Sequence, residues 1–198
     1  MELEKRIIDA VAPHPGVQGI RLTGSRAEGS AGELSDWDFL VNACDFAALA
    51  EALPRLLAPL DPLVQQWDRL SPEYCWMLIL PDPVKVDLIF PDEPHAVEPP
   101  WEPEADNLDS IDAHFWDWVL WLKAKELAGK RDLVARQLEK LFDYLLAPLG
   151  VTTPPSSIAE AVACYRIARD RAERTLGRVV RRDVDVTVSP ALEDPSGN

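Results

Sequence analysis

Basic residues are scarce in this 198-residue chain: 20 Lys and Arg stand against 34 Asp and Glu, which gives a formal net charge of -14. Contacts to phosphate supply most of the affinity of nucleic-acid-binding proteins, so this deficit argues against a protein that coats DNA or RNA. An acidic surface attracts small cations instead, whether metal ions or a polyamine-like molecule. The charge balance therefore predicts no nucleic-acid partner.

Cysteines and long apolar runs are also rare. The three cysteines, Cys44, Cys75 and Cys164, are odd in number and widely spaced, which is not the pattern of a disulfide framework or a zinc site. The longest apolar runs, such as Cys75–Leu80, are far shorter than the ~20 residues that cross a bilayer. The N-terminal segment contains no hydrophobic signal region. We therefore expect a soluble, cytoplasmic protein with no membrane partner.

Proline is the residue in excess, with 18 copies, and it divides the chain. Residues 91–106 contain five prolines and six acids but no Lys or Arg. This composition cannot build a core and predicts an extended connector. We place an α/β domain at residues 1–92, the connector at 93–106, a helical domain at 107–182 and a tail at 183–198.

Apolar periodicity predicts a mixed sheet with helices for the first domain. Helical spacing indicates helices over residues 2–11 and 45–57. Runs of β-prone residues indicate strands at 19–23, 37–42, 63–67, 74–80 and 84–90. Only Pro81-Asp82-Pro83 joins the last two runs, which favours an antiparallel hairpin because a parallel return needs a longer crossover.

The second half of the chain has helical periodicity. We expect an all-α bundle of three helices, over residues 110–128, 131–146 and 158–176. The arginines from Arg166 to Arg182 are expected to form salt bridges or a solvated face, because the chain as a whole is so acidic. The last ten residues of the tail are expected to be disordered.

Residues 24–41 are the segment most informative about chemistry. They begin Gly24-Ser25-Arg26-Ala27, and Ser35-Asp36-Trp37-Asp38 leads into the next strand. A strand that ends in Gly-Ser before a helical turn offers N–H groups and a hydroxyl to phosphate oxygens. Alternate strand residues share a face, so Asp36 and Asp38 project together. Two adjacent carboxylates repel each other, and their hard oxygens are suited to Mg²⁺ that bridges to phosphates.

A third acid, Asp87, lies inside the apolar run of residues 84–90 and shares one face with Lys85 and Ile89. A buried carboxylate without a partner is costly. Asp87 is therefore expected either to pair with Lys85 or to face a polar site.

The order of these features resembles the nucleotidyltransferase superfamily typified by DNA polymerase β: a strand, Gly-Ser, roughly ten residues, Asp-x-Asp, and a later strand with a third Asp. The Gly-Ser-Arg-Ala start and the Ser-Asp-x-Asp end resemble its small-substrate branch, which includes the aminoglycoside adenylyltransferases and the minimal nucleotidyltransferases. Residues 115–127, followed by 130–133, are more loosely similar to the helix after the catalytic domain of streptomycin-type adenylyltransferases.

The resemblance implies roles for seven residues. Nucleotide binding is implied for Gly24, Ser25, Arg26 and Lys125, with Lys123 as the alternative to Lys125. Metal binding and catalysis are implied for Asp36, Asp38 and Asp87, the last as third ligand or general base. The implied reaction is Mg²⁺-dependent transfer of a nucleoside monophosphate, AMP from ATP, to a hydroxyl of a small cationic acceptor such as an aminoglycoside. Two metal ions would assist the reaction, and the helical domain would bind the acceptor.

Two alternatives remain open. A protein AMP transferase of the toxin–antitoxin type would use the same chemistry on a Tyr or Ser of a partner protein. A catalytically silent nucleotide-binding or scaffold protein is the second alternative, and the presence of all three acids argues against it. Metal-dependent turnover of a nucleoside triphosphate distinguishes the enzymes from the silent protein. The oligomeric state is not indicated by the sequence.

Overall fold

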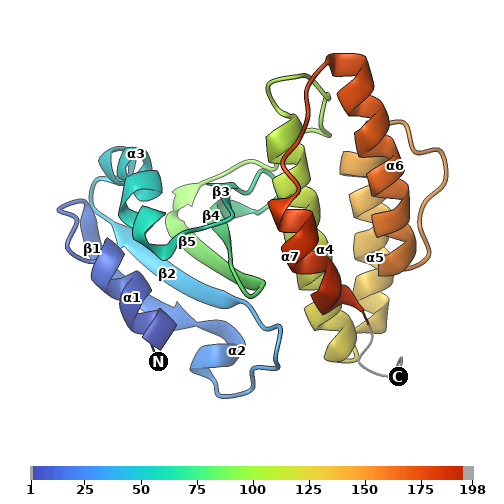
Figure 1. Ribbon diagram of the computed structural model, residues 1–198. Helices are drawn as coiled ribbons and strands as arrows, with labels where there is room; N and C mark the ends of the chain where they lie inside the picture. The colour runs from blue at the N-terminus through green and yellow to red at the C-terminus, as the bar shows by residue number, and fades with distance from the viewer. Residues whose placement is uncertain (1, 194–198) are drawn as a thin grey trace. The chain divides into compact units, whose positions relative to one another are not determined.

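The computed structural model describes residues 2–193. The chain divides into two compact units, and the division falls between Glu98 and Pro99, within the proline-rich and acidic segment (Figure 1). The first unit contains the sheet, and the second contains helices α4 to α7. No helix within residues 2–193 combines the length and the apolar character of a membrane span.

Five strands form one mixed sheet in the order β1-β2-β5-β4-β3. They are β1 (Val17–Thr23), β2 (Trp37–Ala43), β3 (Val64–Trp67), β4 (Glu73–Leu80) and β5 (Val84–Pro94). Strands β2 and β5 run parallel, and the other neighbouring pairs run antiparallel, which confirms the β4–β5 hairpin and the mixed sheet. Strand β5 continues beyond its expected end at Phe90, because Glu73 at the start of β4 pairs with Pro94.

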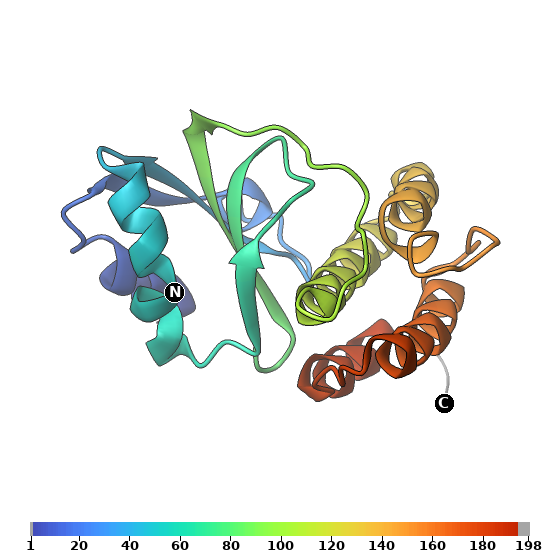
Figure 2. The ribbon, with the colours of Figure 1, turned by 90° about the horizontal axis from the view of Figure 1, so that it is seen from above.

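Helices α1 (Glu2–Val11) and α3 (Phe46–Leu57) cover one face of the sheet (Figure 2). Helix α3 begins after Asp45, whose carboxylate accepts a hydrogen bond from the backbone N–H of Ala48 at 3.1 Å, as a capping residue does. A short 3-10 turn, Ala58–Leu60, follows α3. The core of this unit lies between the two helices and the apolar face of the sheet.

Successive residues of a strand point to opposite faces of the sheet, so Asp38 of β2 and Asp87 of β5 lie on the face away from α1 and α3. In β5, Val86 and Leu88 belong to the core, so Asp87 between them faces the other way. In β2, Phe39 belongs to the core, and the preceding Asp38 likewise faces away from α1 and α3. The sheet therefore separates an apolar face from a face that carries carboxylates.

The second unit contains α4 (Leu108–Leu127), α5 (Arg131–Leu141), α6 (Ile158–Leu176) and α7 (Asp183–Leu192). Helix α4 contacts the other three helices. Helix α5 continues as a π-helical segment, Phe142–Leu146. Helix α6 is capped by Ser157, whose hydroxyl accepts a hydrogen bond from the Glu160 N–H at 3.2 Å, and it ends at Gly177 in the left-handed region.

Helix α7 corrects the expectation of a tail over residues 183–198. Valines occupy every second position from Val184 to Val188, as they would in a strand. Val184 and Val188, however, are four residues apart and both are buried, which is the spacing of one helix face. Asp185 in the first turn favours the helix N-terminus and pairs with arginines of α6. The expected disorder of the last ten residues is therefore wrong for residues 189–192, and residues 194–198 lie outside the described residues.

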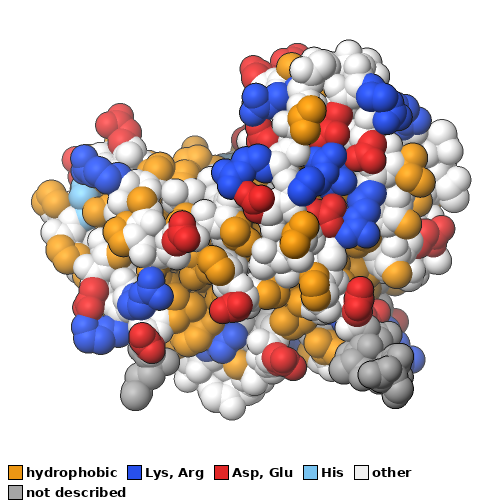
Figure 3. Space-filling model, in the orientation of Figure 1, with side chains coloured by type: hydrophobic (Ala, Val, Ile, Leu, Met, Phe, Trp, Pro, Cys, Tyr) orange, Lys and Arg blue, Asp and Glu red, His pale blue; other side chains and the backbone are white. Residues whose placement is uncertain are grey.

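Several arginines between Arg166 and Arg182 pair with acids, which is one of the two arrangements expected from the acidic composition. Arg169 donates to Asp185 at 2.9 Å, Arg166 also pairs with Asp185, and Arg182 lies 2.7 Å from Glu173. Basic and acidic side chains are interspersed over α6 and α7 in Figure 3. These ion pairs give Arg166, Arg169 and Arg182 acidic partners within the second unit.

Asp112 of α4 lies in a buried polar network. One of its oxygens, Oδ1, accepts hydrogen bonds from the Tyr165 hydroxyl at 2.6 Å and from the Trp116 indole at 3.2 Å, and Arg169 lies 3.6 Å away. Burial raises the pKa of Asp112 to about 6, although Tyr165 and Arg169 oppose the rise. The folded protein therefore retains a proton on Asp112 at pH values where the unfolded chain loses it.

This shift predicts a pH-dependent stability that Asp112→Asn removes. Because the folded pKa exceeds the unfolded value, the stabilising contribution is complete below about pH 4 and is lost as the pH rises through about 6. Two pKa units at about 1.4 kcal/mol each amount to about 3 kcal/mol. The unfolding free energy of wild type minus that of Asp112→Asn should fall by up to this amount between about pH 4 and pH 7. Urea unfolding at several pH values measures this difference in unfolding free energy. A difference that does not change with pH would contradict the raised pKa of Asp112.

Candidate active site

A one-turn helix, α2 (Gly24–Ala27), follows β1 at the edge of the sheet. Gly24 has a φ of 66°, in the left-handed region that favours glycine. A Cβ atom placed on Gly24 would lie 2.6 Å from Oδ2 of Asp38. Glycine is thus required here for the backbone conformation and for the close approach of this turn to the Asp38 carboxylate.

The loop that follows α2 is held by its own hydrogen bonds. The Ser25 carbonyl accepts from the Ser30 N–H at 2.9 Å, and the Ser35 hydroxyl accepts from the Gly32 N–H at 2.9 Å. These contacts fold residues 25–35 back on themselves. The loop therefore returns the chain to β2 with Asp36 and Asp38 beside the Gly24 turn.

Arg26 contacts the segment that carries the two acids. Its Nε donates to the carbonyls of Ser35 at 3.0 Å and Asp36 at 3.1 Å, and its Nη2 donates to Ser35 at 2.6 Å. Its guanidinium lies 4.2 Å from the ring centroid of Trp37, the residue between the acids. Burial lowers the pKa of Arg26, against the charges of Asp36 and Asp38. Arg26 thus positions the start of β2, and its predicted contact with phosphate stays a prediction.

The three acids singled out from the sequence lie in one region. Asp38 and Asp87 are register partners on the parallel strands β2 and β5, and such neighbouring strands are about 4.8 Å apart. Asp36 immediately precedes β2, is 5% exposed, and its charge raises the pKa of Asp87. The structure thus brings Asp36, Asp38 and Asp87 together with the Gly24 turn.

Lys85 is the partner of Asp87. Its Nζ lies 2.6 Å from Oδ1 of Asp87, and the two side chains are 5% and 14% exposed. The pair lies on one face of β5, two residues apart. Burial raises the pKa of the Asp87 carboxyl, although the Lys85 ammonium opposes the rise. Of the two possibilities left open by the sequence, the ion pair with Lys85 is present.

The predicted lysine ligands of the nucleotide lie in the second unit. Lys125, in the last turn of α4, places its ammonium 5.0 Å from the ring centroid of Trp121. Lys123 is buried and pairs with Glu126 at 2.9 Å. These contacts lie within α4, and a role for either lysine in nucleotide binding stays a prediction.

Asp68 is an acid near this site that sequence reasoning missed. It directly follows β3, and its Oδ1 accepts a hydrogen bond from the Leu70 N–H at 2.8 Å. Its charge contributes to the raised pKa of Asp87. The sequence places Asp68 at the end of a strand. That position does not show which strands lie beside it, so it does not indicate that Asp68 is near Asp87.

The donor chemistry of the site fits a magnesium ion held jointly with a nucleotide. Within residues 2–193, no three His, Cys, Asp or Glu side chains are grouped so that they could hold a metal ion by themselves. Mg²⁺ is usually bound by one or two carboxylates, with water and substrate phosphates as its remaining ligands. Asp36 and Asp38 can supply two such carboxylates next to the turn predicted to bind phosphate.

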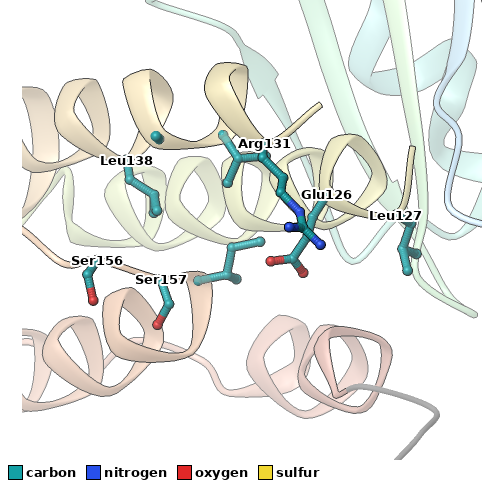
Figure 4. A pocket seen from close by; sticks show the side chains of 9 residues that line it. Glu126, Leu127, Arg131, Leu138, Ser156 and Ser157 are labelled. Carbon is teal, nitrogen blue, oxygen red and sulfur yellow. The ribbon is translucent and has the colours of Figure 1, made fainter. Parts of the chain in front are cut away.

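A cavity of about 460 Å³ lies elsewhere, within the second unit. It is lined by the end of α4, by α5 and by the start of α6, with Glu126 and Arg131 at one end (Figure 4). The hydroxyl of Ser157 in its wall already caps α6. With one acid and one base, this lining lacks the negative charge that would favour a polycation, so the cavity is not assigned to the acceptor.

No family model and no curated protein matches the sequence. An aminoglycoside 6-adenyltransferase from Bacillus subtilis is structurally similar over 96% of this chain and 95% of its own, with 12% identity and a TM-score of 0.34. The GLD-2/RNP-8 complex is similar over 96% of this chain and 68% of the matched chain, with 14% identity and a TM-score of 0.41.

With both TM-scores below 0.5, what these neighbours act on is not transferred to this chain.

Proposed function

We propose that this chain is a Mg²⁺-dependent nucleotidyltransferase that transfers AMP from ATP to a hydroxyl of a small, cationic acceptor. The observation that carries the proposal is the contact between the Gly24 turn and Asp38, whose neighbour across the parallel strands is Asp87. A turn suited to phosphate and a pair of carboxylates suited to Mg²⁺ therefore meet at one point of the sheet.

The chain's own residues supply binding and orientation. The backbone of Gly24 and the hydroxyl of Ser25 would bind the β- and γ-phosphates, and Asp36 and Asp38 would hold Mg²⁺. When bound, the metal stabilises the negative charge that develops on the phosphates. Arg26, through its hydrogen bonds to the Ser35 and Asp36 carbonyls, keeps the two carboxylates beside the turn.

The reaction is an in-line displacement at the α-phosphorus. The acceptor oxygen forms a bond to this phosphorus, the bond to the oxygen bridging to the β-phosphate breaks, and pyrophosphate leaves. The proton of the acceptor hydroxyl passes to Asp87, which lies beside Asp38. Most of the acceleration is expected from positioning and from charge stabilisation.

The acceptor is assigned by charge. A net charge of -14 and a site with Asp36, Asp38, Asp68 and Asp87 favour a cationic molecule such as an aminoglycoside. We further propose that residues 107–182 form an all-α substrate-binding bundle and that Lys125 contacts the triphosphate.

A pyrophosphate-release screen tests this function. Wild type is incubated with ATP, Mg²⁺ and a panel of aminoglycosides, beside Asp36→Asn/Asp38→Asn as the inactive control. We expect release with wild type that depends on one cationic acceptor, and none with the control. If ATP binds with Mg²⁺ but no small molecule triggers release, the small-molecule acceptor is wrong and a protein acceptor is favoured.

A further inference from the structure

The Lys85–Asp87 pair places an ammonium group inside the proposed active site. The Lys85 ammonium lies 2.6 Å from Oδ1 of Asp87, and only 5% and 14% of the two side chains are exposed. Removing one partner of such a pair leaves an uncompensated charge, which is strongly unfavourable. The pair is therefore a fixed part of the electrostatics around Asp87.

The geometry of β5 imposes this pairing. Lys85 and Asp87 are alternate residues of one strand, so their side chains share a face without help from another element. Across the sheet, Asp87 is flanked by its register partners Asp38 on β2 and Met77 on β4. Asp87 thus has a cation on its own strand and a carboxylate on the next strand.

This arrangement limits how many metal ions the site can hold. A divalent ion that bridges Asp38 and Asp87 would approach a carboxylate whose Oδ1 already binds an ammonium. The two cations would repel each other across a few ångströms of largely buried surroundings. No three acidic side chains of residues 2–193 are grouped as a metal site. Asp36 and Asp38 are the two carboxylates proposed above to hold Mg²⁺.

We propose that Lys85 takes the place of a second metal ion. The site then holds one divalent cation, on Asp36 and Asp38, whereas the family resemblance implies two. Asp87 stays outside the coordination sphere of that cation and acts through Oδ2 as the acceptor of the hydroxyl proton. Lys85 is a positioning residue, because it acts only through its contact with Asp87. The inference rests on the proposed function.

The number of bound Mn²⁺ ions tests the proposal without a measurement of activity. Full-length chain is titrated with Mn²⁺ in the presence of an equimolar non-hydrolysable ATP analogue, and free Mn²⁺ is followed by electron paramagnetic resonance. We expect one ion per wild-type chain. Asp38→Asn should weaken its binding at least about tenfold, whereas Lys85→Met/Asp87→Asn, which removes the ion pair without leaving an unpaired charge, should leave the affinity nearly unchanged. Two ions per wild-type chain, or equal losses in the two variants, would overturn the proposal.

Substitutions of Lys85 test directly whether it takes the place of a second metal ion. Lys85→Met frees the Asp87 carboxylate and is expected to create a second Mn²⁺ site, whereas Lys85→Arg keeps the cation and should bind one ion. A single ion in a folded Lys85→Met would contradict the proposal. If Lys85→Met does not fold, Lys85→Met/Asp87→Asn removes both charges and is expected to fold. This double variant should then bind one Mn²⁺ with wild-type affinity, and weaker binding would identify Asp87 as a ligand.

The same titration separates this inference from the proposed function. A wild-type chain that binds neither the nucleotide analogue nor Mn²⁺ would contradict the proposed function itself. A wild-type chain that binds the analogue with two Mn²⁺ ions would leave that function intact and overturn only the role of Lys85.

Discussion

Asp38→Asn is expected to lower the rate of pyrophosphate release from ATP by about a thousandfold. Metal-borne charge stabilisation contributes several kcal/mol to reactions of this kind, and about 4 kcal/mol corresponds to this factor. Asn has nearly the size of Asp, and Asp38 is not part of the apolar core, so the fold should be retained. Steady-state assays at saturating ATP and acceptor, with circular dichroism to verify folding, measure the effect.

Glu33→Gln is the matched control for this variant. Glu33 lies in the loop between α2 and β2, is exposed, and precedes the strand that carries Asp38. Removal of its charge changes the local electrostatics without removing a proposed metal ligand, so the rate should stay close to that of wild type. Equal losses in the two variants would point to a general effect of charge, and an Asp38→Asn enzyme with nearly full activity would contradict the assignment of Asp38.

Gly24→Ala is expected to lower the rate of pyrophosphate release about a hundredfold. A methyl group at this position meets Oδ2 of Asp38 at 2.6 Å, so the carboxylate or the turn must shift. A displacement of about 1 Å at a reacting centre can lower the rate by two orders of magnitude. The left-handed φ of 66° adds a backbone cost of about 1 kcal/mol to stability. The rate of pyrophosphate release and the free energy of unfolding should therefore both fall.

Gly29→Ala separates the two causes. Gly29 has a similar φ of 70°, but a Cβ atom there would have no heavy atom within 4 Å beyond those of Gly29 and its two chain neighbours. The variant should show the same loss of stability with little loss of activity. If Gly29→Ala and Gly24→Ala lose the same activity, backbone strain in the loop is responsible and the contact with Asp38 is not.

The elements of the first unit could be predicted from local patterns. Alternation of apolar residues indicates the strands, the Asp45 cap indicates the start of α3, and the short Pro81–Pro83 connection indicates a hairpin. Each of these signals lies within a few residues of the structure that it specifies. The placement of Asp36 and Asp38 beside the Gly24 turn follows from short-range patterns of the same kind.

Side-chain contacts that depend on the tertiary structure could not be predicted from the sequence. The guanidinium of Arg26 donates to the backbone carbonyls of Ser35 and Asp36, and no residue type marks a carbonyl as an acceptor. The alternatives for Asp87 were open because the alternation of β5 also allows a polar site without Lys85. Helix α7 was missed because its valines have both the spacing of a strand and the spacing of a helix face.

The central claim is that the Gly24–Asp38 motif binds a nucleotide through a metal ion, and calorimetry tests it most directly. ATP is titrated into wild type and into Asp36→Asn/Asp38→Asn, each with and without Mg²⁺. We predict binding to wild type that requires Mg²⁺ and is lost in the double variant. ATP binding that is equally strong without Mg²⁺ or in the double variant, or no binding to wild type at all, would contradict the account.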